Sequence, residues 1–185
     1  MKHANTWSEA LMLAAACIAI PCVPANAVGS DADSVTAPAA SHWQVIPAAT
    51  FVPRSSNMSV SYVSGGCVTA PVGTELTHKV LLDDGVTANY LRTYYRDEAP
   101  KGRLLSALTR YDAQGSLDDY GITYSTNATG YDSVLSPSLG HVVDRMDHAY
   151  VVNVQFLDDP DVVFANGFDE VRPLLFCGVR LMWSD

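Results

Sequence analysis

Histidine and aspartate side chains come close together at one place in the chain, where His141, Asp144, Asp147 and His148 share a short stretch. A histidine oriented by a carboxylate can act as a general base or bind a metal. No serine, however, lies in a G-x-S-x-G nucleophile context. Asp144 and Asp147 also suit a turn that precedes a strand at Tyr150. We therefore predict a capped turn here and no catalytic site.

Carboxylates gather at several predicted turns and could supply hard oxygen ligands to calcium. They occur at Asp83-Asp84, Asp97-Glu98, Asp118-Asp119, Asp158-Asp159 with Asp161, and Asp169-Glu170. None of these groups has the spacing of a calcium loop, so we interpret them as solvated turn residues and predict no cofactor. If calcium binds at all, the candidates are Asp158, Asp159 and Asp161.

Tyrosines are dense in the middle of the chain and could form a stacking surface for sugar rings, because a tyrosine has a flat apolar face and a polar tip. Tyr94 and Tyr95 are adjacent, so in a strand they point to opposite faces. Packing in the core or across strands is our main interpretation of these residues. The candidates for a sugar-binding surface are Tyr90, Tyr94, Tyr120 and Tyr124.

Short stretches with a period of two residues follow one another along the chain, separated by turn signals such as Asp83-Asp84-Gly85. The expected strands are 58–62, 76–82, 87–96, 104–111, 120–125, 131–136, 150–156 and 174–183, preceded by an edge strand or extended segment at 42–53. A short helix competes at 104–111, but flanking turns and Tyr111 favour a strand. No helical period interleaves the strands. The pattern predicts an all-β antiparallel sandwich, jelly-roll-like, with an immunoglobulin-like sandwich as the alternative.

The first 27 residues have the order of a secretory signal: Lys2 at the start, an apolar run over 10–20, and Ala25-Asn26-Ala27 before a cleavage point. The apolar run is too short to span a bilayer. A lipoprotein signal is the alternative, but neither Cys17 nor Cys22 has a leucine three residues upstream. We predict a signal peptide at 1–27 and a secreted or periplasmic protein.

The rest of the chain divides into a flexible leader and one domain. Residues 28–41 are small and polar without periodicity, and we predict a single β-sandwich domain over 42–185. The formal net charge of −9 argues against nucleic acid or an anionic membrane as partner. No membrane contact is expected after signal cleavage. We interpret 158–173 as a long insertion before the last strand.

Two cysteines, Cys67 and Cys177, lie outside the predicted signal peptide. In an exported protein such a pair usually forms a disulfide, although two buried free thiols are the alternative. The bond would be worth about 4–5 kcal/mol in the chain-entropy model. It requires the two Cα atoms to lie within about 7 Å of each other.

Several strand-and-turn motifs over about 71–183 resemble those of uncharacterised secreted bacterial β-sandwich proteins. They are PVGTEL, LLDDG, LTRYDAQG, HVVDRMDHAYVVNVQF and FCGVRLMW. FANGFDE is similar to a short segment found near the C-termini of exported bacterial proteins. The resemblance implies export and the fold class, and it transfers no activity to any residue of this chain.

Three functional hypotheses remain open from the sequence. The first is an exported non-enzymatic β-sandwich that serves as a structural or interaction module, with a protein or carbohydrate partner and the option of a homo-oligomer. The second is a carbohydrate-binding module that uses the surface tyrosines. The third is a carboxylate-dependent hydrolase, which needs two carboxyl groups across a cleft.

Overall fold

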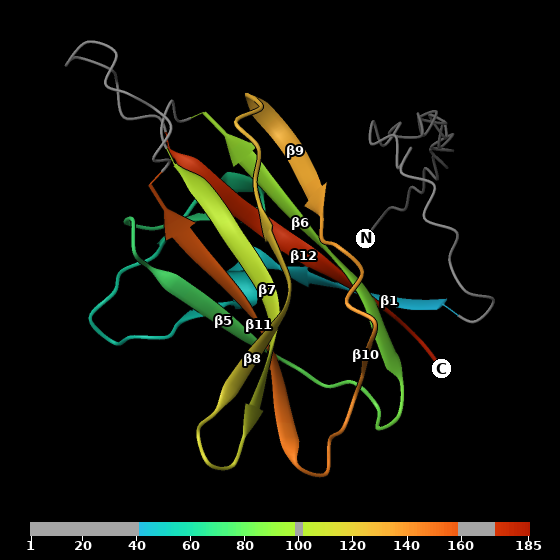
Figure 1. The fold of residues 1–185 in the computed structure, drawn as a ribbon. Coiled ribbons are helices and arrows are strands. Elements are labelled where there is room, and N and C mark those ends of the chain that lie inside the picture. Colours follow the sequence, from blue (N-terminus) through green and yellow to red (C-terminus); the bar gives the residue numbers. More distant parts are fainter. Residues whose placement is uncertain (1–40, 99–101, 159–172) are drawn as a thin grey trace, which may run out of the picture. The chain divides into compact units, whose positions relative to one another are not determined.

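The computed structural model describes residues 41–98, 102–158 and 173–185, which form two antiparallel sheets packed face to face (Figure 1). The first, which we call sheet B, contains in spatial order β2 (Val52–Pro53), β5 (Glu75–Val80), β11 (His148–Leu157), β7 (Arg103–Asp112) and β8 (Leu117–Tyr124). In Figure 1, β7 and β11 of this sheet lie in front of β6 and β12 of the other sheet.

The second sheet, sheet A, is built on two long central strands, β6 (Thr87–Asp97) and β12 (Leu174–Ser184). The outer side of β6 pairs with β9 (Gly130–Leu135) and β10 (His141–Val142). The outer side of β12 pairs with β1 (Ser41–Pro47) and β4 (Val68–Thr69), and β4 pairs with β3 (Ser61–Tyr62). Two single 3-10 turns occur at η1 (Ala48–Thr50) and η2 (Ser64–Gly66).

Alternation along each strand decides which side chains enter the core, because successive side chains point to opposite faces. In β11, Tyr150, Val152, Val154 and Phe156 are core residues, and the residues between them face away from sheet A. In β6 and β12, Leu91, Tyr95, Val179 and Leu181 fill the same core from the other side. Each sheet therefore has one inner apolar face and one outer face.

Successive strands pass back and forth between the sheets: β5 in sheet B, β6 in sheet A, β7 and β8 in sheet B, β9 in sheet A, β11 in sheet B and β12 in sheet A. This is the connectivity of a jelly-roll sandwich. The predicted all-β, jelly-roll-like fold is confirmed, as is the strand at 104–111, which is β7. The strand expected at 58–62 is wrong in extent, since only Ser61–Tyr62 pairs, and both residues are exposed.

Cys67, just before β4, and Cys177, in β12, form a disulfide with Cα atoms 4.0 Å apart. The predicted pairing is confirmed, and it joins the last core strand to an early segment of the chain. The next residue, Gly178, has a φ of 146° and lies opposite Pro47 of β1. A Cβ there would lie 2.7 Å from the backbone oxygen of Ile46, so only glycine fits at this crossing.

The expected signal peptide (1–27) and nearly all of the expected leader (28–41) lie outside the described residues, as does most of the 158–173 insertion. Ser41 already belongs to β1. In the described ranges, the model contains no helix of the length and apolarity that a membrane span requires.

Candidate functional site

The outer face of sheet B carries polar side chains that are nevertheless buried. Asn153 lies between the core residues Val152 and Val154, and Thr109 follows the core residue Leu108, so both point outward. Asn153 is 7% exposed, Thr109 0% and the neighbouring Ala107 1%. These side chains are thus shielded from solvent on a face that does not pack against sheet A. Burial of this kind requires hydrogen-bond partners.

Those partners form a network in which the donor and the acceptor of each hydrogen bond to Thr109 can be assigned. Thr109 Oγ1 donates to Asp119 Oδ1 at 2.5 Å, because an ionised carboxylate can only accept. Thr109 Oγ1 therefore accepts from Asn153 Nδ2 at 2.8 Å, and the same Nδ2 group lies 3.3 Å from the Tyr111 hydroxyl. The Asn153 amide oxygen is left as an acceptor that takes no hydrogen bond from any described residue. An acceptor in such a position costs about 1–3 kcal/mol if it stays unpaired.

Arg54 connects this network to the opposite edge of the sheet. It follows β2, its Nη1 donates to Glu75 Oε1 at 2.7 Å, and its guanidinium lies 5.6 Å from the centroid of the Tyr111 ring. The hydrogen bond with Glu75 raises the pKa of Arg54 above its ordinary value. We call the six connected residues the polar face; they are Arg54, Glu75, Thr109, Tyr111, Asp119 and Asn153.

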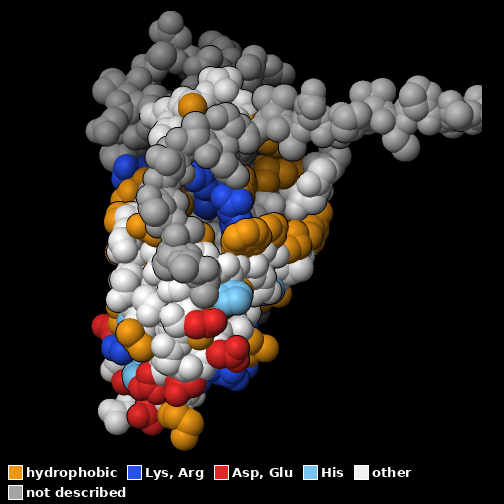
Figure 2. Space-filling model, turned by 90° about the vertical axis from the view of Figure 1, so that its right-hand side faces the viewer, with side chains coloured by type: hydrophobic (Ala, Val, Ile, Leu, Met, Phe, Trp, Pro, Cys, Tyr) orange, Lys and Arg blue, Asp and Glu red, His pale blue; other side chains and the backbone are white. Residues whose placement is uncertain are grey.

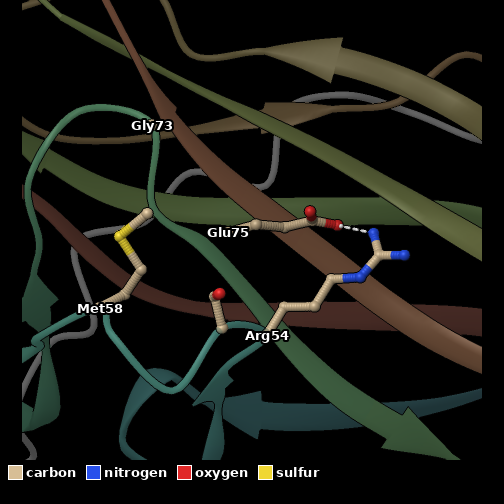
Figure 3. Close-up of a pocket in the computed structure, with 5 residues that line it drawn as sticks. Arg54, Met58, Gly73 and Glu75 are labelled. Carbon is tan, nitrogen blue, oxygen red and sulfur yellow. Dashed lines mark hydrogen bonds and ion pairs between the residues drawn. The ribbon is translucent and has the colours of Figure 1, made fainter.

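A pocket of about 320 Å³ adjoins the polar face at Arg54 and Glu75 and is also lined by Ser55, Met58 and Gly73. Figure 3 shows the Arg54 and Glu75 side chains pointing toward each other, with the Met58 thioether on the other side of the pocket. Met58 accepts a weak hydrogen bond from Thr74 Oγ1, with the sulfur 3.8 Å away. The pocket thus has one charged wall and one apolar wall.

A second arginine–tyrosine contact lies on the same outer face. Tyr124 is half-exposed and lies opposite Leu105 in the β7–β8 pairing, and the Arg103 guanidinium lies 4.5 Å from the centroid of its ring. A cation–π contact at an exposed site is worth about 0.5–1 kcal/mol, and it favours the observed orientation of the ring. Tyr111 and Tyr124 are therefore two oriented rings on one sheet face.

The histidine and aspartate cluster lies instead at one end of the sandwich. His141 Nε2 is 2.9 Å from the Tyr150 hydroxyl, and its ring stacks on Tyr120 at 4.1 Å. Burial lowers the pKa of His141, and Arg110 acts in the same direction. Asp144 Oδ1 accepts from the backbone N–H groups of residues 146 and 147, as the predicted turn cap requires.

The structure does not bring the four candidate tyrosines together. Tyr90 and Tyr94 lie on β6 next to the core residues Leu91 and Tyr95, so they face away from the core on the outer side of sheet A. Tyr120 is partly buried against the core, and Tyr124 lies on the outer face of sheet B. Of the calcium candidates, Asp158 is exposed, and Asp159 and Asp161 lie outside the described residues. Among the residues that the structure describes, no group of three His, Cys, Asp or Glu side chains could hold a metal.

Sequence reasoning missed Arg54, Asn153 and Thr109. The available signal was Asn153, a polar residue in the centre of the apolar run VVNVQF. Its partners Thr109 and Tyr111 both lie on β7, and the strand register brings them beside it. Asp119 of β8 and Arg54, the residue after β2, join the network through these two residues.

No protein-family model matches the sequence. The comparison with curated proteins likewise gives no match. Among solved structures, the fold is similar to the C-terminal CBM6 of LamC, a marine laminarinase from Zobellia galactanivorans, at 12% identity and a TM-score of 0.48, over 76% of this chain and 98% of that chain.

A second solved structure is the CBM36-1 domain of a multidomain xylanase from the hindgut metagenome of Trinervitermes trinervoides. It shows 7% identity and a TM-score of 0.48, over 76% of this chain and 96% of that chain. A third is CsCBM6-3 from Clostridium stercorarium in complex with cellobiose, with 15% identity and a TM-score of 0.41, over 74% and 90% of the two chains. At these identities the similarity concerns the fold.

Proposed function

We propose that this domain is a non-catalytic module that binds a neutral carbohydrate on the outer face of sheet B, and that it works outside the cytoplasm. The observation that carries the proposal is the polar face, a connected set of charged, amide, hydroxyl and aromatic groups that crosses the sheet. The Cys67–Cys177 disulfide supports an oxidising compartment.

The chemistry of the polar face suits sugar hydroxyls, which donate and accept hydrogen bonds at the same time. Arg54 supplies donors and Asp119 supplies an acceptor. Both side chains are exposed to solvent, so a ligand can reach them. The Asn153 amide oxygen is a further acceptor of the polar face, buried and without a hydrogen bond from any described residue. Sites built to hydrogen-bond a hydroxyl discriminate strongly against analogues that lack it.

The pocket beside Arg54 and Glu75 extends the same surface. Its volume of about 320 Å³ is at the lower end of the range for small-ligand pockets, which suits one sugar unit rather than a large ligand. The Met58 thioether offers an apolar contact for a ring face, and the Arg54–Glu75 pair offers hydrogen bonds to hydroxyls at its edge.

Binding fits the polar face better than hydrolysis does. A glycoside hydrolase needs one carboxylic acid that donates a proton and a second carboxylate that acts as base or nucleophile. The Glu75 carboxylate is bonded to Arg54, and the Asp119 carboxylate accepts from Thr109. Both carboxylates are thus held as acceptors. The face is also polar rather than apolar, which favours a carbohydrate over the protein partner of our first hypothesis.

The test is affinity electrophoresis and calorimetry with a panel of neutral polysaccharides, namely a xylan, a mannan and a β-glucan. We expect Arg54→Ala to weaken binding to the recognised polymer by about tenfold or more, because a charged hydrogen bond is worth about 1.5–3 kcal/mol. We expect Asn153→Ala to weaken it as well. The matched control is Arg145→Ala, which removes an exposed arginine whose Nη1 is 3.7 Å from Asp83.

Two results would contradict the proposal. One is the absence of binding to every neutral polymer in the panel. The other is binding that Arg54→Ala and Arg145→Ala change equally, since the polar face would then play no part in it.

A further inference from the structure

Arg103 lacks the carboxylate partner that four other arginines of this chain have. Those ion pairs are Arg54 with Glu75, Arg96 with Glu98, Arg110 with Asp118, and Arg145 with Asp83. Within the described ranges, Arg103 forms no ion pair, and its buried Nε donates no hydrogen bond. Its guanidinium instead lies against the ring of Tyr124. The charge of this half-buried side chain is therefore not compensated by any described carboxylate.

The strand register places Arg103 on the outer face of sheet B, the same face that carries the polar face. Arg103 precedes the core residue Leu104 on β7, so its side chain points away from sheet A. The next outward residue of β7 is Leu105, which is paired with Tyr124 of β8 on one side and with Gln155 of β11 on the other. We call these four outward residues the Arg103 patch; they are Arg103, Leu105, Tyr124 and Gln155.

Gln155 connects the Arg103 patch to the pocket beside Arg54. One row of paired residues crosses four strands of sheet B and consists of Glu75, Gln155, Leu105 and Tyr124. Glu75 at one end of the row lines the pocket. Neighbouring strands lie about 4.8 Å apart, so the row is about 14 Å long. The half-buried Gln155 amide makes no hydrogen bond with a described residue, so it offers a donor and an acceptor in the middle of the row.

The formal net charge of −9 is compatible with a local cationic site, because charges are unevenly distributed over the surface. In Figure 2, acidic side chains gather in the lower half of the view, and a group of basic side chains lies in the upper half. At the pocket, Glu75 neutralises Arg54, which suits the uncharged hydroxyls of a neutral sugar. Arg103 has no such partner among the described residues, and a guanidinium can bind a carboxylate through two parallel hydrogen bonds.

We propose that the Arg103 patch is a second subsite on the outer face of sheet B, specific for a carboxylate carried by the polysaccharide. The ligand is then a mostly neutral polymer with uronate side groups. Its backbone follows the row from the pocket, Gln155 bonds hydroxyls along the way, and the carboxylate pairs with Arg103. This inference rests on the proposed carbohydrate-binding function and names the substrate class of that site.

Calorimetry with the purified protein compares each neutral polymer with a carboxylated form of the same polymer. The pairs are an unsubstituted xylan with a glucuronoxylan, and a mannan and a β-glucan each with a form partly oxidised to uronate. For the polymer that is recognised, we expect the carboxylated form to bind about tenfold more tightly, because a hydrogen bond to a charged group is strong. This preference should shrink between about 50 mM and about 500 mM NaCl, because salt screens charge interactions.

Substitutions in the Arg103 patch separate charge from hydrogen bonding. Arg103→Ala should lower the affinity for the carboxylated form to that for the neutral form. Arg103→Lys keeps the charge but not the planar fork of donors, so it should retain part of the preference. Arg103→Gln replaces Arg103→Ala if the circular dichroism spectrum of the latter is altered. Gln155→Ala should weaken binding of both forms, and the matched control Arg145→Ala should change neither.

The possible failures of this inference and of the proposed function are distinguishable. Equal affinity for the two members of every pair, or a preference that survives Arg103→Ala, would overturn the inference while the neutral site stands. Binding of carboxylated forms alone, if it depends on Arg103, would support the Arg103 patch and contradict the neutral site. Tighter binding of dextran sulfate than of the carboxylated polymers would overturn the assignment to carboxylates. Binding of no polymer would contradict both proposals.

Discussion

His141 is the residue through which pH should act on stability. Its ring is stacked on Tyr120 and is bonded to the Tyr150 hydroxyl. Burial lowers its pKa, and Arg110 and His148 add to that effect, while Asp118 and Asp144 oppose it. The neutral ring is therefore the form that the folded protein favours.

The sign of the effect follows from proton binding. The unfolded chain takes up a proton on His141 near pH 6.5, whereas the folded protein does so only at lower pH. The free energy of unfolding should therefore fall as pH drops below about 6.5, and the loss should end below the folded pKa. Urea denaturation of the wild type and of His141→Gln, at pH 7.5 and pH 5, measures this. Equal pH dependence in both proteins would refute it.

At the residue scale, the sequence could identify types of side chain but not their neighbours. Asp144 was correctly predicted as a turn cap because its partners are two and three residues away. Asn153 bonds to Thr109, which is 44 residues away, and Arg54 reaches Tyr111 from the bend after β2. Of the tyrosine candidates, Tyr124 is half-exposed, whereas Tyr120 is partly buried against the core. Contacts that depend on register are not encoded in local patterns.

At the level of elements, the crossing of β1 and β12 depends on Gly178. Its φ of 146° and its distance from Ile46 both exclude a side chain. Gly178→Ala should destabilise the domain by about 1–3 kcal/mol from backbone strain, with a further cost from the clash. Gly115 provides the matched control, because its φ of 88° is also positive but a Cβ there meets nothing within 4 Å.

Chemical denaturation of Gly178→Ala and Gly115→Ala compares the two positions. The difference between the two free energies of unfolding reports the clash at Gly178 together with the additional backbone strain at its φ of 146°. If the variants are equally stable, then β1 does not pack against Gly178 in solution, and the edge of sheet A is built differently.

The long strands were predictable for the reason that makes them stable, since each buries one apolar face along its whole length. β7, β11 and β12 matched their expected ranges closely. β2, β3 and β4 have two residues each, which is too short for a period of two to be recognised. The segment at 58–62 shows that an alternating pattern does not by itself make a strand. Its residues alternate as in a strand, but Met58 lies in a loop, from which it contacts Thr74.

For the molecule as a whole, the disulfide is the main covalent restraint. Cys67 and Cys177 are separated by 110 residues, so the bond removes much of the freedom of the unfolded chain. The double variant Cys67→Ala, Cys177→Ala should lose about 4–5 kcal/mol and about 10–15 °C in Tm. Calorimetry with and without reductant checks this: reductant should lower the Tm of the wild type toward that of the variant. A wild-type Tm that stays unchanged after full reduction of the disulfide would contradict the expectation.

The antiparallel pairing of β1 with β12 has a mechanical consequence. Ser41 lies opposite Ser184, so a pulling force between the two ends of the sandwich loads that end pair before any other. The hydrogen bonds of the pair then break one after another, and β1 peels away at low force while the other strands stay intact. Peeling of β1 ends at Pro47, which lies opposite Gly178, and the Cys67–Cys177 link beside it prevents extension of the chain between residues 67 and 177. The domain therefore contains a short extensible tether in series with a covalently locked core.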